Sequence, residues 1–252
     1  MFSAAPNRII ILIVPTKSID EKIPRSLTQS GRSLSDQVYD YLTDQIIRGE
    51  IGYGDKLNIK QIAIQLDTSS MPIRDAIKRL EQDDIVVVKP RSNCFVRVPR
   101  KRKILESIEA RRMIEVFAVR SVYSSVDEES LLPLVQILES MRAIVADAEK
   151  DGNSKRLREY IELDRRYHAE LCNLLRNEYT DRFYRQINMH LSMSFSYGIG
   201  VCHGVGTTFL EHEAILRHLA SHSEKAVSVL ERHLLQSREN ILKESIFQSL
   251  PN

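Results

Sequence analysis

The apolar residues between Ser33 and Val98 change from a helical spacing to a strand-like one, and this order constrains the fold more than any other feature. Three sets recur at intervals of three or four residues, so that each set shares one face of a helix. They are Leu34, Val38, Leu42 and Ile46, then Ile59, Ile62, Ala63 and Leu66, and finally Ile73, Ala76, Ile77 and Leu80. The spacing predicts a first helix that stops near Gly49, a second over about 58–66, and a third that ends near residues 83–84.

Turn residues separate these predicted helices. Gly52–Asp55 follows the first helix as a turn. Before the third helix, Ser69 or Ser70 can cap free amides, and Pro72 suits the first helical turn, where its missing N–H costs nothing.

Two short runs rich in β-branched residues come next, Ile85–Val88 and Cys94–Val98. They flank Pro90–Asn93, a hairpin tip in which asparagine tolerates a positive φ. Three helices followed by a basic hairpin have the order of a winged helix-turn-helix. We therefore predict that residues 31–99 form a DNA-binding domain of this type.

The remainder of the chain has helical patterning only. Arg100–Lys103 is predicted to be a basic linker, and residues 104–248 an all-α domain. The six predicted helices lie near residues 104–125, 127–150, 154–176, 178–197, 207–221 and 223–247. The expected fold class is mainly α, a winged helix-turn-helix joined to a helical bundle.

Charge is distributed unevenly along the sequence. Residues 1–103 hold 18 Lys and Arg against 12 Asp and Glu, whereas residues 104–252 hold 18 against 22. A basic half joined to an acidic half favours a polyanion as the partner of the first half alone.

Cysteine usage and apolar run lengths indicate the compartment. Cys94, Cys172 and Cys202 have neither disulfide-framework nor zinc-finger spacing, which suits a reducing environment. The longest aliphatic run, Ile9–Val14, is too short to span a bilayer. Residues 1–30 are expected to be a poorly ordered extension. We expect a cytoplasmic protein with no membrane partner.

A recognition helix presents polar and basic side chains on the face opposite its apolar stripe. On the third predicted helix these candidates are Ser69, Ser70, Met71, Arg74 and Lys78. Lys60, on the preceding helix, and Arg91, at the wing tip, are candidates for phosphate contacts. For any one of these cations the competing interpretation is a solvated surface charge. Their shared placement favours double-stranded DNA as the partner.

The first half of the chain resembles the DNA-binding domain of GntR-family regulators. The matching strings within residues 34–96 are Val38–Tyr39, Gly54–Leu57, Pro72–Leu80 and Phe95–Val96. That family usually has Arg at the positions of Lys60 and Ser70, and Gly at those of Asp84 and Asn93. The resemblance implies that Arg74 is the retained operator contact, whereas Ser70 gives no basis for carrying over the family's usual operator sequence.

Potential metal ligands lie on three predicted helices of the second half. Asp164 and His168 are four residues apart and project from one helical face. His212 and His233 lie in two other helices. One carboxylate and three imidazoles suit a borderline divalent metal, zinc first, with nickel or manganese as alternatives. The spacing does not show that the four converge, and an exposed Asp–His pair is the competing interpretation. Other possible ligands are His190, His203, His218, His222 and Cys172.

The second half resembles the FCD effector domain of the FadR subgroup of GntR regulators. The matching strings are Glu109–Glu115, Asp164 with His168, Glu211–His212 and His233–Leu234. The resemblance implies that Asp164, His168, His212 and His233 hold a divalent cation and that a small organic acid completes its coordination. It also implies that Arg111, or the adjacent Arg112, binds this effector. Six or seven helices would suit the shorter, VanR-like version of the domain.

These observations predict a transcription regulator, acting as a homodimeric repressor on a near-palindromic operator, and not an enzyme. Its operator affinity would respond to a small carboxylate. A rival hypothesis is a metal-dependent enzyme that uses Glu211 or Glu213 as base. A third is a DNA-binding protein indifferent to ligands, whose metal only pins helices together.

Overall fold

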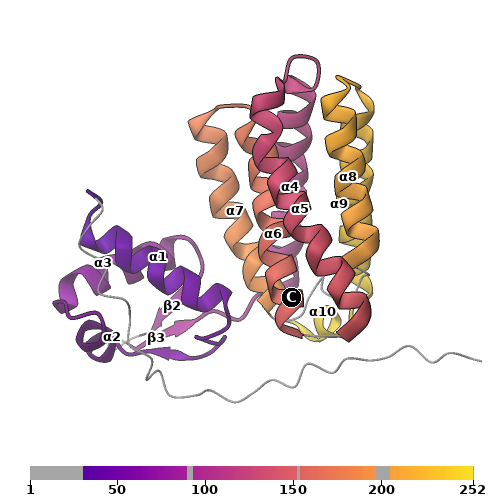
Figure 1. Cartoon of the computed structure of the whole chain (residues 1–252). Coiled ribbons are helices and arrows are strands. Elements are labelled where there is room, and N and C mark those ends of the chain that lie inside the picture. Colours follow the sequence, from indigo (N-terminus) through magenta and orange to yellow (C-terminus); the bar gives the residue numbers. More distant parts are fainter. Residues whose placement is uncertain (1–30, 90–92, 152–153, 197–204, 252) are drawn as a thin grey trace, which may run out of the picture.

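The computed structural model describes residues 31–89, 93–151, 154–196 and 205–251. A small domain of short helices and strands lies beside one end of a taller bundle of helices (Figure 1). The prediction of a mainly α chain, with a winged helix-turn-helix before a helical bundle, is confirmed.

The small domain has the three helices and the hairpin that the apolar spacing predicts. Its helices are α1 (Leu34–Ile47), α2 (Ile59–Gln65) and α3 (Ser70–Gln82), and its strands are β1 (Lys56–Leu57), β2 (Val86–Lys89) and β3 (Asn93–Val96). The antiparallel sheet has the order β1-β3-β2, with Val86 opposite Val96 and Lys56 opposite Phe95. Residues 90–92, which include the predicted wing tip, lie outside the described residues.

Local chemistry accounts for the ends of these helices. The Ser33 hydroxyl accepts from the Asp36 amide at the start of α1, and Gly49, at φ +72°, follows its end. Asn58 caps α2 through the amides of residues 60 and 61. Ser69 occupies the N-cap position of α3, but its side chain makes no capping hydrogen bond. The prediction that a serine caps this helix is therefore not met at Ser69.

Strand β1 is the element of this domain that the sequence did not predict. It is two residues long, too short for an alternating pattern to show. The Gly54 amide donates to the Val96 carbonyl, and the Val96 amide donates to the Asp55 carbonyl. Gly54, at φ +78°, permits the tight turn that brings this segment beside β3.

The second domain is a bundle of long helices. They are α4 (Lys101–Val122), α5 (Glu128–Asp151), α6 (Ser154–Asn173), α7 (Glu178–Ser196), α8 (Val205–Ala220), α9 (Lys225–Lys243) and the short α10 (Ser245–Ser249). Two predicted boundaries differ from this. Residues 101–103 form the first turn of α4 rather than a linker, since Lys and Arg are good helix formers. The last predicted helix is divided at Glu244, whose backbone is extended.

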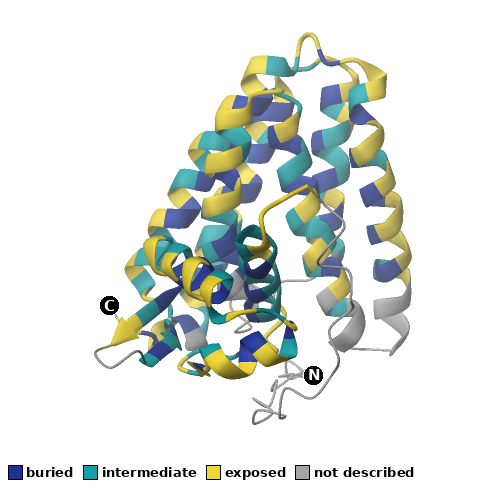
Figure 2. Ribbon diagram, turned by 90° about the vertical axis from the view of Figure 1, so that its left-hand side faces the viewer, coloured by how far each residue is buried: buried dark blue, intermediate teal, exposed yellow. Residues whose placement is uncertain are grey.

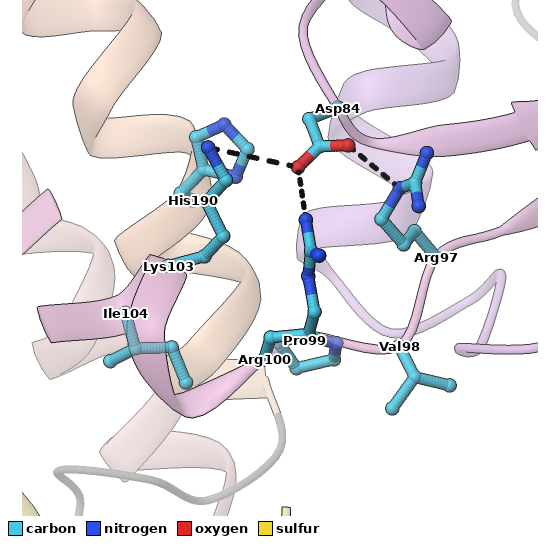
Figure 3. Close-up of a pocket in the computed structure, with 8 residues that line it drawn as sticks. All are labelled: Asp84, Arg97, Val98, Pro99, Arg100, Lys103, Ile104 and His190. Carbon is cyan, nitrogen blue, oxygen red and sulfur yellow. Dashed lines mark hydrogen bonds and ion pairs between the residues drawn. The ribbon is translucent and has the colours of Figure 1, made fainter. Parts of the chain in front are cut away.

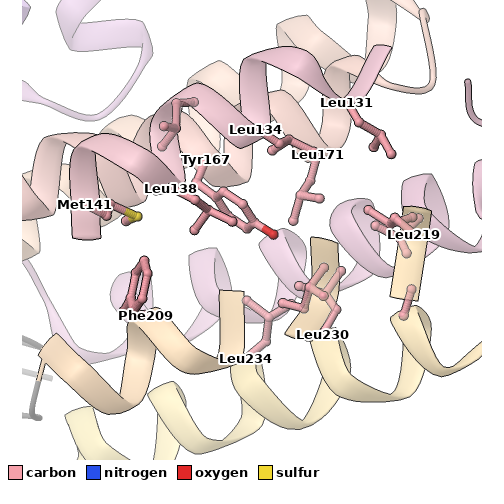
Figure 4. Packing of buried hydrophobic residues seen from close by; sticks show 14 of the residues in the cluster. Leu131, Leu134, Leu138, Met141, Tyr167, Leu171, Phe209, Leu219, Leu230 and Leu234 are labelled. Atoms are coloured by element: carbon pink, nitrogen blue, oxygen red, sulfur yellow. The ribbon is translucent and has the colours of Figure 1, made fainter. Parts of the chain in front are cut away.

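The core of the bundle lies between α5, α6, α8 and α9 (Figure 4). Leu134, Met141, Tyr167, Leu171 and Leu219 are fully buried there. Buried residues follow the inner face of each helix and exposed residues the outer face (Figure 2), as their amphipathic spacing requires. None of the helices in the described part of the chain is long and apolar enough to cross a membrane.

Candidate metal centre and DNA-reading surface

Three helices of the bundle bring three histidines to one buried point. They are His168 of α6, His212 of α8 and His233 of α9, which are 0%, 0% and 6% exposed. The Nε2 atom of His168 lies 3.2 Å from the Nε2 atoms of both His212 and His233. The structure therefore brings together three of the four predicted ligands through the same ring nitrogen.

Two carboxylates fix the orientation of two of these rings. Glu115 of α4 places Oε2 2.7 Å from Nδ1 of His168, and Glu211 places Oε2 2.7 Å from Nδ1 of His233. An ionised carboxylate can only accept a hydrogen bond, so a neutral ring facing one carries its proton on Nδ1. Each Nε2 then keeps its lone pair toward the centre of the cluster. A carboxylate behind a histidine is the usual support of a metal ligand.

The third ring, that of His212, is held by packing. Tyr167 stacks on it with ring centroids 4.4 Å apart, and its hydroxyl donates to the His212 carbonyl at 2.9 Å. The Nδ1 atom of His212 is buried and has no hydrogen-bond partner among the described residues. The fourth predicted ligand, Asp164, lies beside the cluster, with Oδ1 3.6 Å from Nε2 of His212 and 4.0 Å from Nε2 of His168.

Burial keeps two of these rings in the form that binds metals. It lowers the pKa of His168 well below the ordinary value, and the nearby charge of Arg111 acts in the same direction. Burial also lowers the pKa of His212 well below its ordinary value, assisted by His233 and His168. Neutral imidazole is the ligand form, because a protonated ring has no lone pair to donate.

The charges around the histidines do not balance. Three carboxylates surround them, those of Asp164, Glu115 and Glu211, whereas Arg111 is the cation paired with this group among the described residues. With neutral histidines, two negative charges remain, on Asp164 and Glu211, whose side chains are 17% and 32% exposed. A buried charge is costly unless it is paired, and a divalent cation supplies the missing charge.

The spacing of the donor atoms also fits a metal ion. Zinc binds imidazole nitrogens at about 2.0–2.1 Å and usually takes tetrahedral geometry, which places two ligand nitrogens about 3.3 Å apart. The separations of the His168 Nε2 atom from the other two Nε2 atoms are both 3.2 Å. The donor set, the carboxylates behind it and its charge therefore all fit a divalent cation.

The structure distinguishes the two arginines that the sequence left as alternatives. Arg111 is buried, and its Nε donates to Glu115 Oε1 at 2.5 Å, beside the histidine cluster. Arg112 is 40% exposed and pairs with Glu231 of α9 at 2.8 Å. Burial opposes the charge of Arg111, but Glu115, Tyr184 and Asp164 together outweigh it and raise the pKa of Arg111 above its ordinary value.

The alternative ligands that lie within the described residues do not join the cluster. His190 lies at the junction of the two domains, and His222 is exposed, with its ring near the Tyr123 carbonyl. Cys172 is buried one turn beyond His168, and burial raises the pKa of its thiol. His218 lies at the C-terminal end of α8, and His203 is outside the described residues.

Sequence reasoning did not assign Glu115 and Tyr184 to this site, and it treated Glu211 as a possible base. The four-residue spacing of Arg111 and Glu115 was a usable signal, since it places both side chains on one helical face. The Tyr184 hydroxyl donates to Glu115 Oε1 at 2.8 Å. Nothing in the local sequence of α7 signals this contact, which depends on how α7 lies against α4.

The predicted DNA-reading side chains lie on the outer face of α3 and on α2. Arg74, Lys78 and Lys60 are exposed and form no ion pair with any residue that the structure describes. Met71 is 67% exposed, Ser69 is exposed and Ser70 is half-buried. The inner face of α3 packs into the core through Ile73, Ala76, Ile77 and Leu80. Arg91 lies outside the described residues.

Comparison with known families agrees with this architecture. Residues 34–96 match the bacterial regulatory proteins of the gntR family, and residues 106–236, more than half of the chain, match the FCD domain. The fold is thus that of a DNA-binding transcription regulator with a helical effector domain. The chain belongs to the GntR family of bacterial regulators and carries an FCD domain.

Curated relatives are transcription regulators rather than enzymes. The HTH-type regulator YdhC of Bacillus subtilis is 24% identical over 192 residues, which cover 75% of this chain and 82% of YdhC. The HTH-type repressor RspR of Escherichia coli is 23% identical over 56% of this chain and 59% of its own length. The Nta operon regulator of Aminobacter aminovorans is 25% identical over 50% and 56%.

Solved structures share the fold. A GntR regulator from Rhodococcus sp. RHA1 superimposes with a TM-score of 0.70 at 23% identity, covering 84% of this chain and 98% of that one. McbR/YncC of E. coli superimposes with the same TM-score and coverage at 20% identity. At this identity the likeness concerns the fold alone.

Proposed function

We propose that this protein is a repressor whose operator affinity is set by a small carboxylate bound at a divalent-metal centre. Asp164, His168, His212 and His233 would hold the metal, with zinc the best fit. The convergence of three Nε2 lone pairs in a site with two uncompensated negative charges carries this proposal. It is supported by the presence of this site in the effector domain of a regulator family.

The residues of the site suit an organic acid. A bound divalent cation would supply a positive charge that attracts a carboxylate. Arg111 offers a second positive group that can bind a carboxylate through two hydrogen bonds. Its guanidinium is held by Glu115 in this structure. An effector carboxylate that displaces Glu115 from this guanidinium would also alter the hydrogen bond between Glu115 and His168.

On the DNA side, we propose a homodimer that places two α3 helices in successive major grooves. Arg74 and Lys78 would contact bases or phosphates from the outer face of α3, and Lys60 the backbone. Ser70 stands where the family usually has an arginine, so a different operator sequence is expected. Repression is favoured by the relative RspR, which is named a repressor.

The test is a thermal-shift screen of small mono-, di- and tricarboxylates on zinc-loaded and chelator-stripped protein. A ligand at about 100 times its dissociation constant stabilises by about 2.7 kcal/mol. For a chain of this size that corresponds to roughly 5–10 °C. A shift that requires zinc supports the proposal. Acids that shift neither form, although zinc binds, would contradict it and give the metal a structural role.

A further inference from the structure

The last turn of the recognition helix lies against the bundle. Asp83 and Asp84 directly follow α3, and Asp84 has φ +60°, in the region that favours glycine. Figure 3 shows the Asp84 carboxylate facing Arg97 and Arg100, with His190 of α7 beside them. The GntR resemblance leads one to expect glycine at this position. This chain therefore has an acidic pair where its DNA-reading helix meets the other domain.

Helix α7 holds Asp83 from the bundle side. Gln186 donates through Nε2 to Asp83 Oδ1 at 3.0 Å, and the ring of His190 bonds to the Asp83 backbone. From within the winged domain, the Tyr39 hydroxyl donates to Asp83 Oδ2 at 2.6 Å. The residue that ends the recognition helix is thus fixed by α1 on one side and α7 on the other.

An apolar contact reinforces the same junction. Met189 of α7 is 7% exposed and belongs to the hydrophobic core that is otherwise formed by the winged domain. Its sulfur lies 3.8 Å from the Tyr39 hydroxyl. A side chain inserted into a close-packed core cannot slide without displacing its neighbours. Movement of α7 is therefore passed to α1 and to the end of α3.

The opposite face of α7 reaches the histidine cluster. Tyr184 is fully buried and donates to Glu115, whose other oxygen accepts from His168. Burial, together with the Glu115 charge, raises the pKa of Tyr184 well above its ordinary value, so the hydroxyl stays a donor. Tyr184 and Gln186 are two residues apart and point to opposite sides of one rigid helix.

The covalent connection between the domains makes weaker contacts. Arg100 and Lys103 lie 3.4 and 4.0 Å from Asp84, and both side chains are nearly half exposed. Exposed ion pairs at such distances contribute little. The hydrogen bond from Gln186 at 3.0 Å and the buried Met189, both of α7, form a second link between the domains.

We propose that α7 transmits the state of the metal centre to the recognition helix, through Tyr184 on its inner face and Gln186 and Met189 on its outer face. Gln186 is a positioning residue, which acts on DNA through Asp83. The inference rests on the proposed function, since it requires that the histidine cluster be the regulatory site. Coupling of this kind needs two arrangements of the junction, and the metal must favour one of them.

The experiment follows hydrogen–deuterium exchange at the end of α3, over residues 79–88, in the full-length protein with and without zinc. Gln186→Glu places a carboxylate against Asp83. The matched control is Gln136→Glu, at an exposed position of α5. Tyr39→Phe is a second test variant, because it removes the other hydrogen bond to the Asp83 carboxylate and keeps the ring. Zinc affinity and operator affinity are measured on the same samples.

In the wild type and in Gln136→Glu, zinc is expected to change exchange at residues 79–88 and operator affinity by about fivefold or more, the lower end of ordinary coupling. Gln186→Glu should bind zinc normally and lose both responses, and Tyr39→Phe should weaken them. An exchange response that is absent from the wild type, or intact in Gln186→Glu, overturns the role of α7. An exchange response without any change in operator affinity overturns the transmission from the junction to the DNA, whereas the proposed function is decided by the response to carboxylates. Protein that binds no zinc contradicts both.

Discussion

At the scale of single residues, the histidine cluster depends on groups that would not themselves touch a metal. Glu115 and Glu211 each hold one ring by its Nδ1 atom, and their charges exceed that of Arg111. Both features prepare the site before any ion arrives, because the rings need not turn and the charge is already in place. Such supporting carboxylates typically change metal affinity by 10–100-fold.

Glu211→Ala is expected to weaken zinc binding by about 10–100-fold, because the variant lacks the carboxylate that holds Nδ1 of His233. Titration against a chromophoric chelator measures the affinity. Glu213→Ala is the matched control, since Glu213 lies two residues on and pairs with Arg142 on the surface. Equal zinc affinity in both variants would remove Glu211 from the site.

Arg74 is the single residue on which recognition is expected to depend most. Arg74→Ala should weaken binding to a selected operator duplex by about 1–3 kcal/mol for each base that the arginine reads, with an unchanged fold and zinc content. Fluorescence anisotropy and circular dichroism measure operator affinity and fold. Arg48→Ala, on the exposed end of α1, is the control. Unchanged operator affinity in Arg74→Ala would show that α3 is not the reading helix.

At the scale of elements, helices with a clear apolar stripe could be predicted from sequence, whereas short or divided elements could not. Strand β1 has two residues and no periodicity, and the division at Glu244 follows no glycine or proline. The histidine cluster shows the same limit. Its four candidate ligands could be named from residue type and family resemblance. Their convergence, and the roles of Glu115 and Tyr184, depend on the packing of α4, α6, α7, α8 and α9.

Packing of the bundle core rests on the inner face of each helix, and α5 offers a matched pair of leucines. Leu134 is fully buried, whereas Leu132, two residues earlier, is 53% exposed. Leu134→Ala is expected to lower the free energy of unfolding by about 2–5 kcal/mol, because less apolar surface is buried and a cavity remains. Leu132→Ala should change it by less than about 0.5 kcal/mol. Urea denaturation of both variants measures this; similar decreases would place the bundle core elsewhere.

At the scale of the whole molecule, the uneven charge along the chain agrees with DNA binding by the winged domain. The net charge is only +2, and the exposed cations that lack an ion pair in the described structure include Lys60, Arg74 and Lys78 of the winged domain. DNA affinity depends on cations that displace counterions from phosphates, rather than on the net charge of the protein. The position of a lysine should therefore matter more than its charge alone.

Operator binding measured against salt concentration tests this directly. Each phosphate contact contributes about 0.9 to the slope of log affinity against log salt. Lys60→Ala is expected to reduce that slope by about 0.9 per protomer, and by a similar amount on unrelated duplexes, because a phosphate contact carries no sequence information. Lys225→Ala, at the start of α9 in the bundle, removes the same charge and should leave the slope unchanged. An equal decrease of the slope in both variants would mean that the total charge of the protein governs DNA binding. A decrease in Lys60→Ala alone would support DNA contact through the winged domain.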